Sequence, residues 1–224
     1  MILAAGHGKR MRPLTEHTPK PLLMVGDKTL IEYHIEALAN ADIHNIVINT
    51  GRLGSQFEEK LGDGRQYGVS LRYSHEGDSP LETGGGICKA LPLLESSEFL
   101  AVNGDIWTDY NFSTLSHKPK SPCHLILVNN PEHNPNGDFS FSDNTLSNDG
   151  EQRYTFSGIA VYQKEFFASI KEQAFSLAPL LKQAINEQCA SAEIHYGQWY
   201  DIGTPKRLEE LNQKLKANVL ADLE

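Results

Sequence analysis

Short apolar runs alternate with helical stripes along most of the chain, and this alternation restricts the possible folds to a small set. Residues 1–5 are apolar and stop at Gly6, as expected of a buried strand. Because this run begins at Met1, we expect a few native residues upstream of it. Further strands are predicted at residues 44–50, 69–74, 99–103, 125–128, 156–162 and 193–200.

Helical periodicity fills the intervals between these strands. Leu30, Ile31, Ile35 and Leu38 share one helical face. One short helix opens at residues 85–87, at the end of the glycine triplet 84–86, and cannot pass far beyond Pro92. The other helices are predicted at residues 29–42, 53–61, 164–172, 176–188 and from the Thr204-Pro205 pair onward.

This order of elements predicts an α/β fold. We expect a three-layer, Rossmann-like, mostly parallel sheet with helices on both faces. Residues 129–155 differ, because turn formers and short alternating pieces predict β-hairpins there. The chain is therefore interpreted as one domain over residues 1–224, with a β-rich insertion at about 129–155. Ligands of such sheets bind at the carboxyl ends of the strands.

Charge and composition exclude several classes of protein. The 224 residues carry a formal net charge of −9, which argues against binding to duplex nucleic acid. Three widely spaced cysteines indicate a reducing compartment rather than a disulfide framework. Apolar runs of transmembrane length and a signal peptide are both lacking, so we expect a cytoplasmic protein that binds no membrane.

A basic, glycine-containing loop follows the first strand. Gly6 and Gly8 let a backbone approach a phosphate closely, while Lys9, Arg10 and Lys20 add positive charge. The Rossmann fingerprint fails here for want of a third glycine, and the P-loop fails for want of Gly-Lys-Ser/Thr. The pattern alone leaves two readings open, a phosphate cradle and a solvated basic turn.

Several further motifs accompany this loop, and together they resemble the sugar-1-phosphate nucleotidyltransferase family. The motifs are Leu-Ala-Ala-Gly-His-Gly-Lys-Arg-Met at residues 3–11, Thr-Pro-Lys-Pro-Leu at 18–22, Glu-Thr-Gly-Gly-Gly at 82–86, Val-Asn-Gly-Asp at 102–105 and Trp-Tyr-Asp-Ile-Gly-Thr-Pro at 199–205. They span nearly the whole chain in the family's order. The short C-terminus and residues 103–110 resemble the members that transfer a uridylyl group to a cell-wall sugar.

The resemblance implies an enzyme with two small substrates, UTP and a sugar 1-phosphate, and with Mg²⁺ as cofactor. It implies catalytic roles for Arg10, Lys20, Asp105 and Asp201, and a metal site at Asp105 and Asp201. The nucleotide-binding residues that it implies are Ala5, Gly6, Gly8, Lys9, Arg10, Lys20, Glu82, Gly84 and Asn103. The implied sugar-binding residues are Gly137, Asp138, Gly158 and Asp201.

Two of these assignments also have a chemical basis and an alternative. Asp105 and Asp201 each end an apolar strand, and carboxylates at strand ends suit Mg²⁺, which otherwise keeps water and phosphate ligands. An isolated Asp at such a position is more often a turn or N-cap residue. Asp109 is interpreted as structural, His34 as a hydrogen-bonded core histidine, and Trp107 and Trp199 as packing residues.

The sugar side departs from the larger hexose-1-phosphate enzymes of the family. Their Glu-Lys-Pro segment is replaced by Gly150-Glu151-Gln152-Arg153-Tyr154, which leaves room for a bulkier sugar bearing a lactyl ether. Arg153 could meet the carboxylate of such a sugar, or could be an exposed turn residue.

The sequence leaves three alternatives to this function. The enzyme could be a guanylyl- or thymidylyltransferase for mannose or glucose 1-phosphate, or a cytidylyltransferase for phosphocholine or another alcohol phosphate. A non-catalytic nucleotide-sugar sensor is the third, although such a protein would be expected to lose Arg10, Lys20, Asp105 or Asp201. We expect a monomer or a small homo-oligomer.

Overall fold

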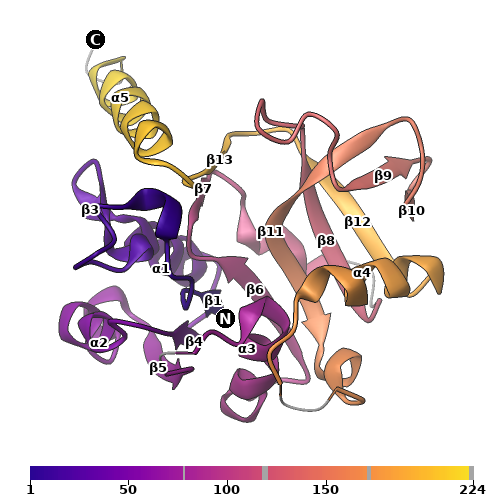
Figure 1. Cartoon of the computed structure of the whole chain (residues 1–224), viewed down its shortest axis with the longest axis horizontal. Coiled ribbons are helices and arrows are strands. Elements are labelled where there is room, and N and C mark those ends of the chain that lie inside the picture. The colour runs from indigo at the N-terminus through magenta and orange to yellow at the C-terminus, as the bar shows by residue number, and fades with distance from the viewer. Residues whose placement is uncertain (78, 118–120, 171–172, 222–224) are drawn as a thin grey trace.

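The computed structural model describes residues 1–77, 79–117, 121–170 and 173–221. In this described part, nine strands form the main sheet, with seven of them in the order β10-β9-β11-β6-β1-β4-β5. The other two extend it beside β11, because β8 pairs with β11 and β12 pairs with β8. In Figure 1, α1 and α2 lie on the left with β4 and β5, and α4 lies on the right with the hairpin β9–β10 at the other end of the sheet.

The strands of this sheet are β1 Ile2–Leu3, β4 Asn45–Thr50, β5 Ser70–His75, β6 Glu98–Asn103, β8 Cys123–Val128, β9 Phe139–Ser142, β10 Thr145–Ser147, β11 Arg153–Gln163 and β12 Ala190–His195. Two small ribbons pair β2 Met24–Val25 with β3 Lys28–Thr29, and β7 Ile106–Thr108 with β13 Trp199–Asp201. The α-helices are α1 Leu30–Asn40, α2 Ser55–Leu61, α3 Glu82–Ala90, α4 Leu177–Asn186 and α5 Pro205–Ala221. Single 3₁₀ turns are η1 Lys9–Met11, η2 Lys20–Leu22, η3 Arg65–Tyr67, η4 Leu91–Leu93, η5 Phe112–His117 and η6 Lys164–Phe167.

Alternation along the strands divides the core between the two faces of the sheet. On β6, Phe99 and Ala101 join the cluster under α3 and α4, whereas Leu100 and Val102 join the cluster under α1 and α2. Successive side chains of a strand point to opposite faces, so a strand that is apolar throughout needs cover on both. The predicted three-layer α/β arrangement is therefore confirmed.

The sheet is mixed rather than uniformly parallel. The core β6-β1-β4-β5 is parallel, as predicted, and β8 and β12 are parallel to each other. The long strand β11 runs antiparallel to both β6 and β8 and so joins the two parallel groups. The hairpin β9–β10 lies within the segment for which turn chemistry predicts hairpins.

Three predicted elements are wrong in detail. The glycine triplet lies inside α3, which begins at Glu82. Other segments of the protein pack closely against the three glycines and occupy the space that side chains would fill. Residues 164–167 form only a 3₁₀ turn, and the last two residues of the predicted helix, 171 and 172, lie outside the described residues. The predicted strand 193–200 is two strands, β12 and β13, which pair in different sheets.

A third small core anchors α5. Leu208 and Leu211 pack with Met11, Val25 and Ile202, so the start of this helix rests beside the glycine loop. Its far end extends away from the body of the molecule (Figure 1). Among the described residues, none of the helices has the length and apolar character needed to cross a membrane.

Candidate active site

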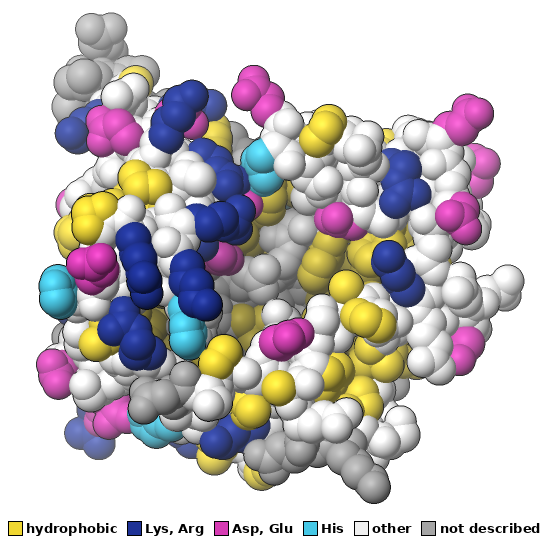
Figure 2. Space-filling model, in the orientation of Figure 1, with side chains coloured by type: hydrophobic (Ala, Val, Ile, Leu, Met, Phe, Trp, Pro, Cys, Tyr) yellow, Lys and Arg dark blue, Asp and Glu magenta, His cyan; other side chains and the backbone are white. Residues whose placement is uncertain are grey.

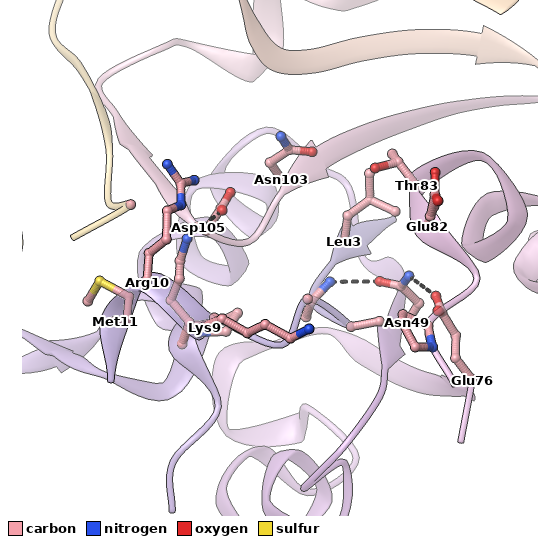
Figure 3. A pocket seen from close by; sticks show the side chains of 18 residues that line it. Leu3, Lys9, Arg10, Met11, Asn49, Glu76, Glu82, Thr83, Asn103 and Asp105 are labelled. Carbon is pink, nitrogen blue, oxygen red and sulfur yellow. Dashed lines mark hydrogen bonds and ion pairs between the residues drawn. The ribbon is translucent and has the colours of Figure 1, made fainter. Parts of the chain in front are cut away.

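A cavity of about 340 Å³ opens at the carboxyl ends of β1, β4 and β6. Its wall includes Asp105 of the predicted metal site and most residues of the predicted nucleotide site: Ala5, Gly6, Gly8, Lys9, Arg10, Lys20, Glu82 and Asn103. Arg10 and Asp105 lie at one end of this nucleotide-side cavity, while Asn49, Glu76, Glu82 and Thr83 lie at the other (Figure 3). The loop after β1 thus meets two other segments at one edge of the sheet, where open α/β sheets bind ligands.

The glycine loop is held open by contacts from outside it. Gly8 has φ of +60°, and a Cβ atom there would lie 2.9 Å from Thr15 Cγ2, so only glycine fits. The Thr15 hydroxyl donates to the Gly8 carbonyl at 2.7 Å. Arg52, which precedes α2, donates to the carbonyls of Thr15 and Glu16 at 2.8 and 3.1 Å. Within the described residues, the N–H groups of Gly6 and Gly8 donate no hydrogen bond, which leaves them available to a phosphate oxygen.

Lys20 and Asp105 form an ion pair in the wall of this cavity. Lys20 Nζ lies 2.7 Å from Asp105 Oδ2, and the lysine side chain is only 9% exposed. A buried ammonium group needs such a partner, because burial without one is strongly unfavourable. The pair holds a positive charge inside the cavity in a defined position, with the second carboxylate oxygen, Oδ1, left free of hydrogen bonds among the described residues.

Asp201 is brought close to Asp105 by the ribbon β7–β13. Asp201 pairs with Ile106 in this ribbon, and the Ile202 N–H donates to the Asp105 carbonyl at 2.9 Å. The Asp201 side chain does not line the cavity; its Oδ2 accepts from Arg207 Nη1 at 2.8 Å and lies 3.1 Å from His133 Nε2. Neither partner was predicted from the sequence: Arg207 lies on α5, six residues beyond Asp201, whereas His133 comes from a distant loop.

The carboxylates of Asp105 and Asp201 suit a hard divalent cation that takes most of its ligands from water and phosphate. In the described part of the chain, no group of three or more His, Cys, Asp or Glu side chains is arranged to hold a metal. Two carboxylates, one just before β7 and one at the end of its partner β13, each with one oxygen engaged by a cation, suit Mg²⁺, which completes its shell with water and substrate phosphates. They do not suit a structural zinc site, which needs four protein ligands.

A buried polar chain forms the far wall of the cavity. The Ala4 N–H donates to Asn49 Oδ1 at 2.7 Å, and Asn49 Nδ2 donates to Glu76 Oε1 at 2.6 Å (Figure 3). Glu76 Oε2 accepts from the Leu81 N–H at 2.9 Å. Neither Asn49 nor Glu76 was predicted as a site residue, although each stands at the carboxyl end of a parallel strand, and that position is the signal that could have found them.

The start of α3 differs from the expectation for Gly84. Glu82 has φ of +56°, an uncommon backbone for a residue with a side chain, and lines the cavity with Thr83. Gly84 is buried and does not line it, since its N–H donates to the Phe175 carbonyl at 3.1 Å. Phe175 N–H in turn donates to the Leu81 carbonyl at 3.1 Å, so the segment before α4 is bonded to the start of α3.

A second cavity of about 440 Å³ adjoins the first, and the two share Leu3, Thr83 and Asn103 in their walls. The predicted sugar residues Gly137, Asp138 and Gly158 line this sugar-side cavity. Gly158 has φ of +81°, and a Cβ atom there would lie 2.4 Å from Asn103 Nδ2. The absence of a side chain at Gly158 thus lets Asn103 stand at the junction of the two cavities.

Asp138 and Arg153 shape the loop beside this second cavity. Asp138 Oδ2 accepts from the Phe156 N–H at 2.8 Å, which fixes the carboxylate beside β11. Arg153 donates to the carbonyls of Asn136, Asn148 and Asp138 at 2.9, 2.8 and 2.8 Å. Its guanidinium group is therefore engaged in holding the loop.

The remaining residues singled out from the sequence have supporting positions. His34 Nε2 lies 2.8 Å from the Ile106 carbonyl, and burial lowers the pKa of His34 to about 4. Asp109 Oδ1 accepts from the Gln198 N–H at 2.9 Å and lies 2.8 Å from His195 Nε2, as expected of a structural residue. Trp199 donates to the Ser157 carbonyl, and Trp107 packs against Tyr200 and Tyr33.

The charges are distributed unevenly around the hollow. Lys and Arg side chains gather along its left edge, over the N-terminal part of the chain, while hydrophobic side chains are prominent on the right (Figure 2). One wall therefore suits an anion such as a triphosphate, and the other suits a less charged group.

The fold and this phosphate-suited loop define a nucleotidyltransferase. The model of the nucleotidyl transferase family matches residues 1–139, and the chain belongs to this family.

Two relatives match over nearly their full lengths. The chain is 48% identical to the N-acetylmuramate α-1-phosphate uridylyltransferase of Neisseria meningitidis, over 94% of this chain and 95% of that protein. It is 30% identical to the enzyme of the same name from Caulobacter vibrioides, over 92% of both.

A solved structure supports the fold independently. The putative glucose-1-phosphate thymidylyltransferase of Bacillus anthracis, in complex with a sucrose, superposes with a TM-score of 0.85 at 21% identity, over 95% of this chain and 92% of that one.

Proposed function

We propose that the protein is a uridylyltransferase that converts UTP and N-acetylmuramate 1-phosphate to UDP-N-acetylmuramate and pyrophosphate. The observation that carries the proposal is the 48% identity, over nearly the whole of both chains, to a protein that bears this name. The two adjoining cavities support it, because the reaction requires one site for a triphosphate and a neighbouring site for a sugar phosphate. Recycling of cell-wall sugar is the corresponding cellular role.

The chemistry asks for charge neutralisation and alignment rather than a general base. An oxygen of the sugar phosphate, already ionised, attacks the α-phosphorus of UTP, and pyrophosphate leaves from the opposite side. Asn103, at the junction of the two cavities, stands where the two substrates meet, and is placed to bond the ribose or the sugar.

Positive charge for this step comes from the glycine loop and Lys20. The free N–H groups of Gly6 and Gly8, together with Arg10, bind the β- and γ-phosphates and stabilise the leaving pyrophosphate. Lys20, held in the cavity wall by Asp105, stabilises the charge that develops on the α-phosphate.

Asp105 and Asp201 would hold Mg²⁺. When bound, the cation supplies charge neutralisation between the attacking and transferred phosphates. The two aspartates are suited to this role because the ribbon β7–β13 pairs Asp201 with Ile106, and the N–H of Ile202, the residue after Asp201, donates to the Asp105 carbonyl. Arg207 and His133 orient the Asp201 carboxylate.

A pyrophosphate-release assay tests the proposal. The four nucleoside triphosphates are paired with the 1-phosphates of N-acetylmuramate, N-acetylglucosamine, glucose and mannose, and with phosphocholine. We expect the highest kcat/KM for UTP with N-acetylmuramate 1-phosphate. A preference for GTP with mannose 1-phosphate, or for CTP with phosphocholine, would contradict the proposal. Lack of turnover with every pair, together with tight binding of a nucleotide sugar, would indicate a sensor.

A further inference from the structure

The sugar-side cavity has walls that are part apolar and part polar, with few charged side chains. Its apolar surface comes from Leu3, Ala101, Phe139, Phe156, Ala160 and Leu177. The charged residues in its wall are Asp138, Arg153 and Lys182. A sugar that carries methyl groups together with one carboxylate matches such a cavity, provided that one of the two cations is available to the carboxylate.

Arg153 is the less available of the two cations. Nε, Nη1 and Nη2 each donate to a backbone carbonyl, so three of the five N–H groups of this side chain hold the loop and fix the position of the guanidinium group. Moving the guanidinium group toward a ligand would leave those carbonyls unsatisfied, which costs free energy. Arg153 thus contributes its charge to the cavity at a fixed position, and the loop depends on it.

Lys182 has the opposite character. It lies on α4 next to Leu181, is exposed, and among the described residues its ammonium group takes part in no ion pair or hydrogen bond. Its backbone is nevertheless fixed, because the Asn148 side chain donates to the Lys182 carbonyl at 2.8 Å. Since Arg153 in turn bonds the Asn148 carbonyl, the loop and α4 are joined at the residue that carries the free charge.

The beginning of α4 adds to the same potential. Ser176, Leu177 and Ala178 line the cavity, and the Ser176 side chain does not cap the helix. The first N–H groups of a helix and its dipole favour a nearby anion. Lys182 therefore supplements a region that is already weakly attractive to a carboxylate.

We propose that Lys182 is the specificity-determining residue for the sugar and pairs with the carboxylate of its lactyl ether. This inference rests on the function proposed above. N-acetylmuramate differs from N-acetylglucosamine by this ether alone, so the pair of sugar phosphates isolates the contact that Lys182 makes. A lysine suits the task because its flexible stem lets a point charge follow the ligand.

The test compares wild type, Lys182→Met and Lys182→Arg on both sugar phosphates with saturating UTP. For Lys182→Met we expect the KM for N-acetylmuramate 1-phosphate to rise about tenfold, as for loss of one charged hydrogen bond at a partly exposed site. The KM for N-acetylglucosamine 1-phosphate, the KM for UTP and kcat should stay within about twofold. Lys182→Arg should recover most of the loss, and the Lys182→Met effect should shrink in high salt, because ions screen exposed pairs.

A matched control removes the same charge elsewhere. Lys216→Met changes an exposed lysine on α5 and should leave both sugars unaffected. An equal rise in KM for both sugar phosphates in Lys182→Met would assign Lys182 a structural role and overturn the inference, as would unchanged kinetics. If wild type fails to use N-acetylmuramate 1-phosphate at all, the proposed function falls and the inference falls with it, so the two failures are distinguishable.

Discussion

The two cavities are built in different ways. The nucleotide-side cavity is made by backbone and by motif residues of the glycine loop, with one partly buried ion pair between Lys20 and Asp105. The sugar-side cavity is made by side chains of β9, β11 and α4, which are remote in sequence. Backbone donors recognise a phosphate, which is common to all substrates of such enzymes, whereas side chains are free to differ from one sugar to another.

An arginine holds a loop at each cavity. Arg52 donates to two carbonyls of the glycine loop, and Arg153 donates to three carbonyls of the loop around Asp138. The conformation of each loop therefore depends on the guanidinium group of an arginine that lies outside that loop. This parallel makes the two halves of the site separable by experiment.

The largest expected effect comes from removing the divalent cation, and it concerns the nucleotide-side cavity. Chelation with EDTA should lower turnover by at least about three orders of magnitude, because a bound cation contributes several kcal/mol to transition-state stabilisation. Mg²⁺ in excess should restore it. Asp105→Asn should raise the Mg²⁺ concentration for half-maximal rate, measured together with direct Mg²⁺ binding by calorimetry. Full activity in EDTA would remove the proposed role of both aspartates.

The next effect concerns Lys20. Lys20→Ala should lower kcat by about two to three orders of magnitude, because it removes the charge that stabilises the α-phosphate and leaves Asp105 without its partner. Lys60→Ala, on α2, removes an exposed charge of the same kind and serves as control. Thermal unfolding of both variants separates loss of chemistry from loss of fold. Turnover close to that of wild type in Lys20→Ala would contradict the assignment.

His34, which packs behind the nucleotide-side cavity, should make the stability of the folded protein decrease at acidic pH. Burial depresses its folded-state pKa to about 4 from an ordinary value near 6.5, so between these values the unfolded chain binds a proton that the folded one does not. The stability that neutral His34 contributes is complete above pH 6.5, and about 3 kcal/mol of it is lost as the pH falls to 4. Urea unfolding at several pH values should show a shallower decline in His34→Gln, whose amide can still donate to Ile106. Parallel declines in the two proteins would exclude His34 as the cause.

The smallest expected effects test most directly whether the two cavities are independent. Arg52→Lys and Arg153→Lys keep the charge but lose the planar fork that reaches several carbonyls at once. We expect Arg52→Lys to raise the KM for UTP about three- to tenfold, and Arg153→Lys to raise the KM for the sugar phosphate by a similar factor. Each variant should leave the other KM unchanged in steady-state kinetics. Equal changes in both constants for either variant would mean that the two loops act as one unit.

The two halves also differ in how far their structure could be predicted from the sequence. The strand–loop order placed Gly6, Gly8, Lys20 and Asp105 in one cavity, because parallel strands bring their carboxyl ends to the same edge. Local pattern also predicted the hairpin around Asp143-Asn144, both of which have positive φ.

Contacts between distant segments could not be predicted in this way. The Asn49–Glu76 pair, the His133–Asp201 pair and the packing of Phe175 on Gly84 join residues 27 to 91 positions apart. Such contacts depend on the register of the sheet and on how α3 and α4 pack, which hydrophobic periodicity leaves open. The same limit explains why one predicted strand is two strands in different sheets.

The hydrogen bonds around Phe175 have a mechanical consequence. Its carbonyl accepts from the start of α3 and its N–H donates to Leu81, while the next residue, Ser176, begins the approach to α4. The first turns of these two helices, one beside each cavity, are thus clamped together by a single peptide segment. Because this segment is bonded to α3 and leads directly into α4, a displacement of either helix is transmitted to the other, and the walls of the two cavities are mechanically coupled.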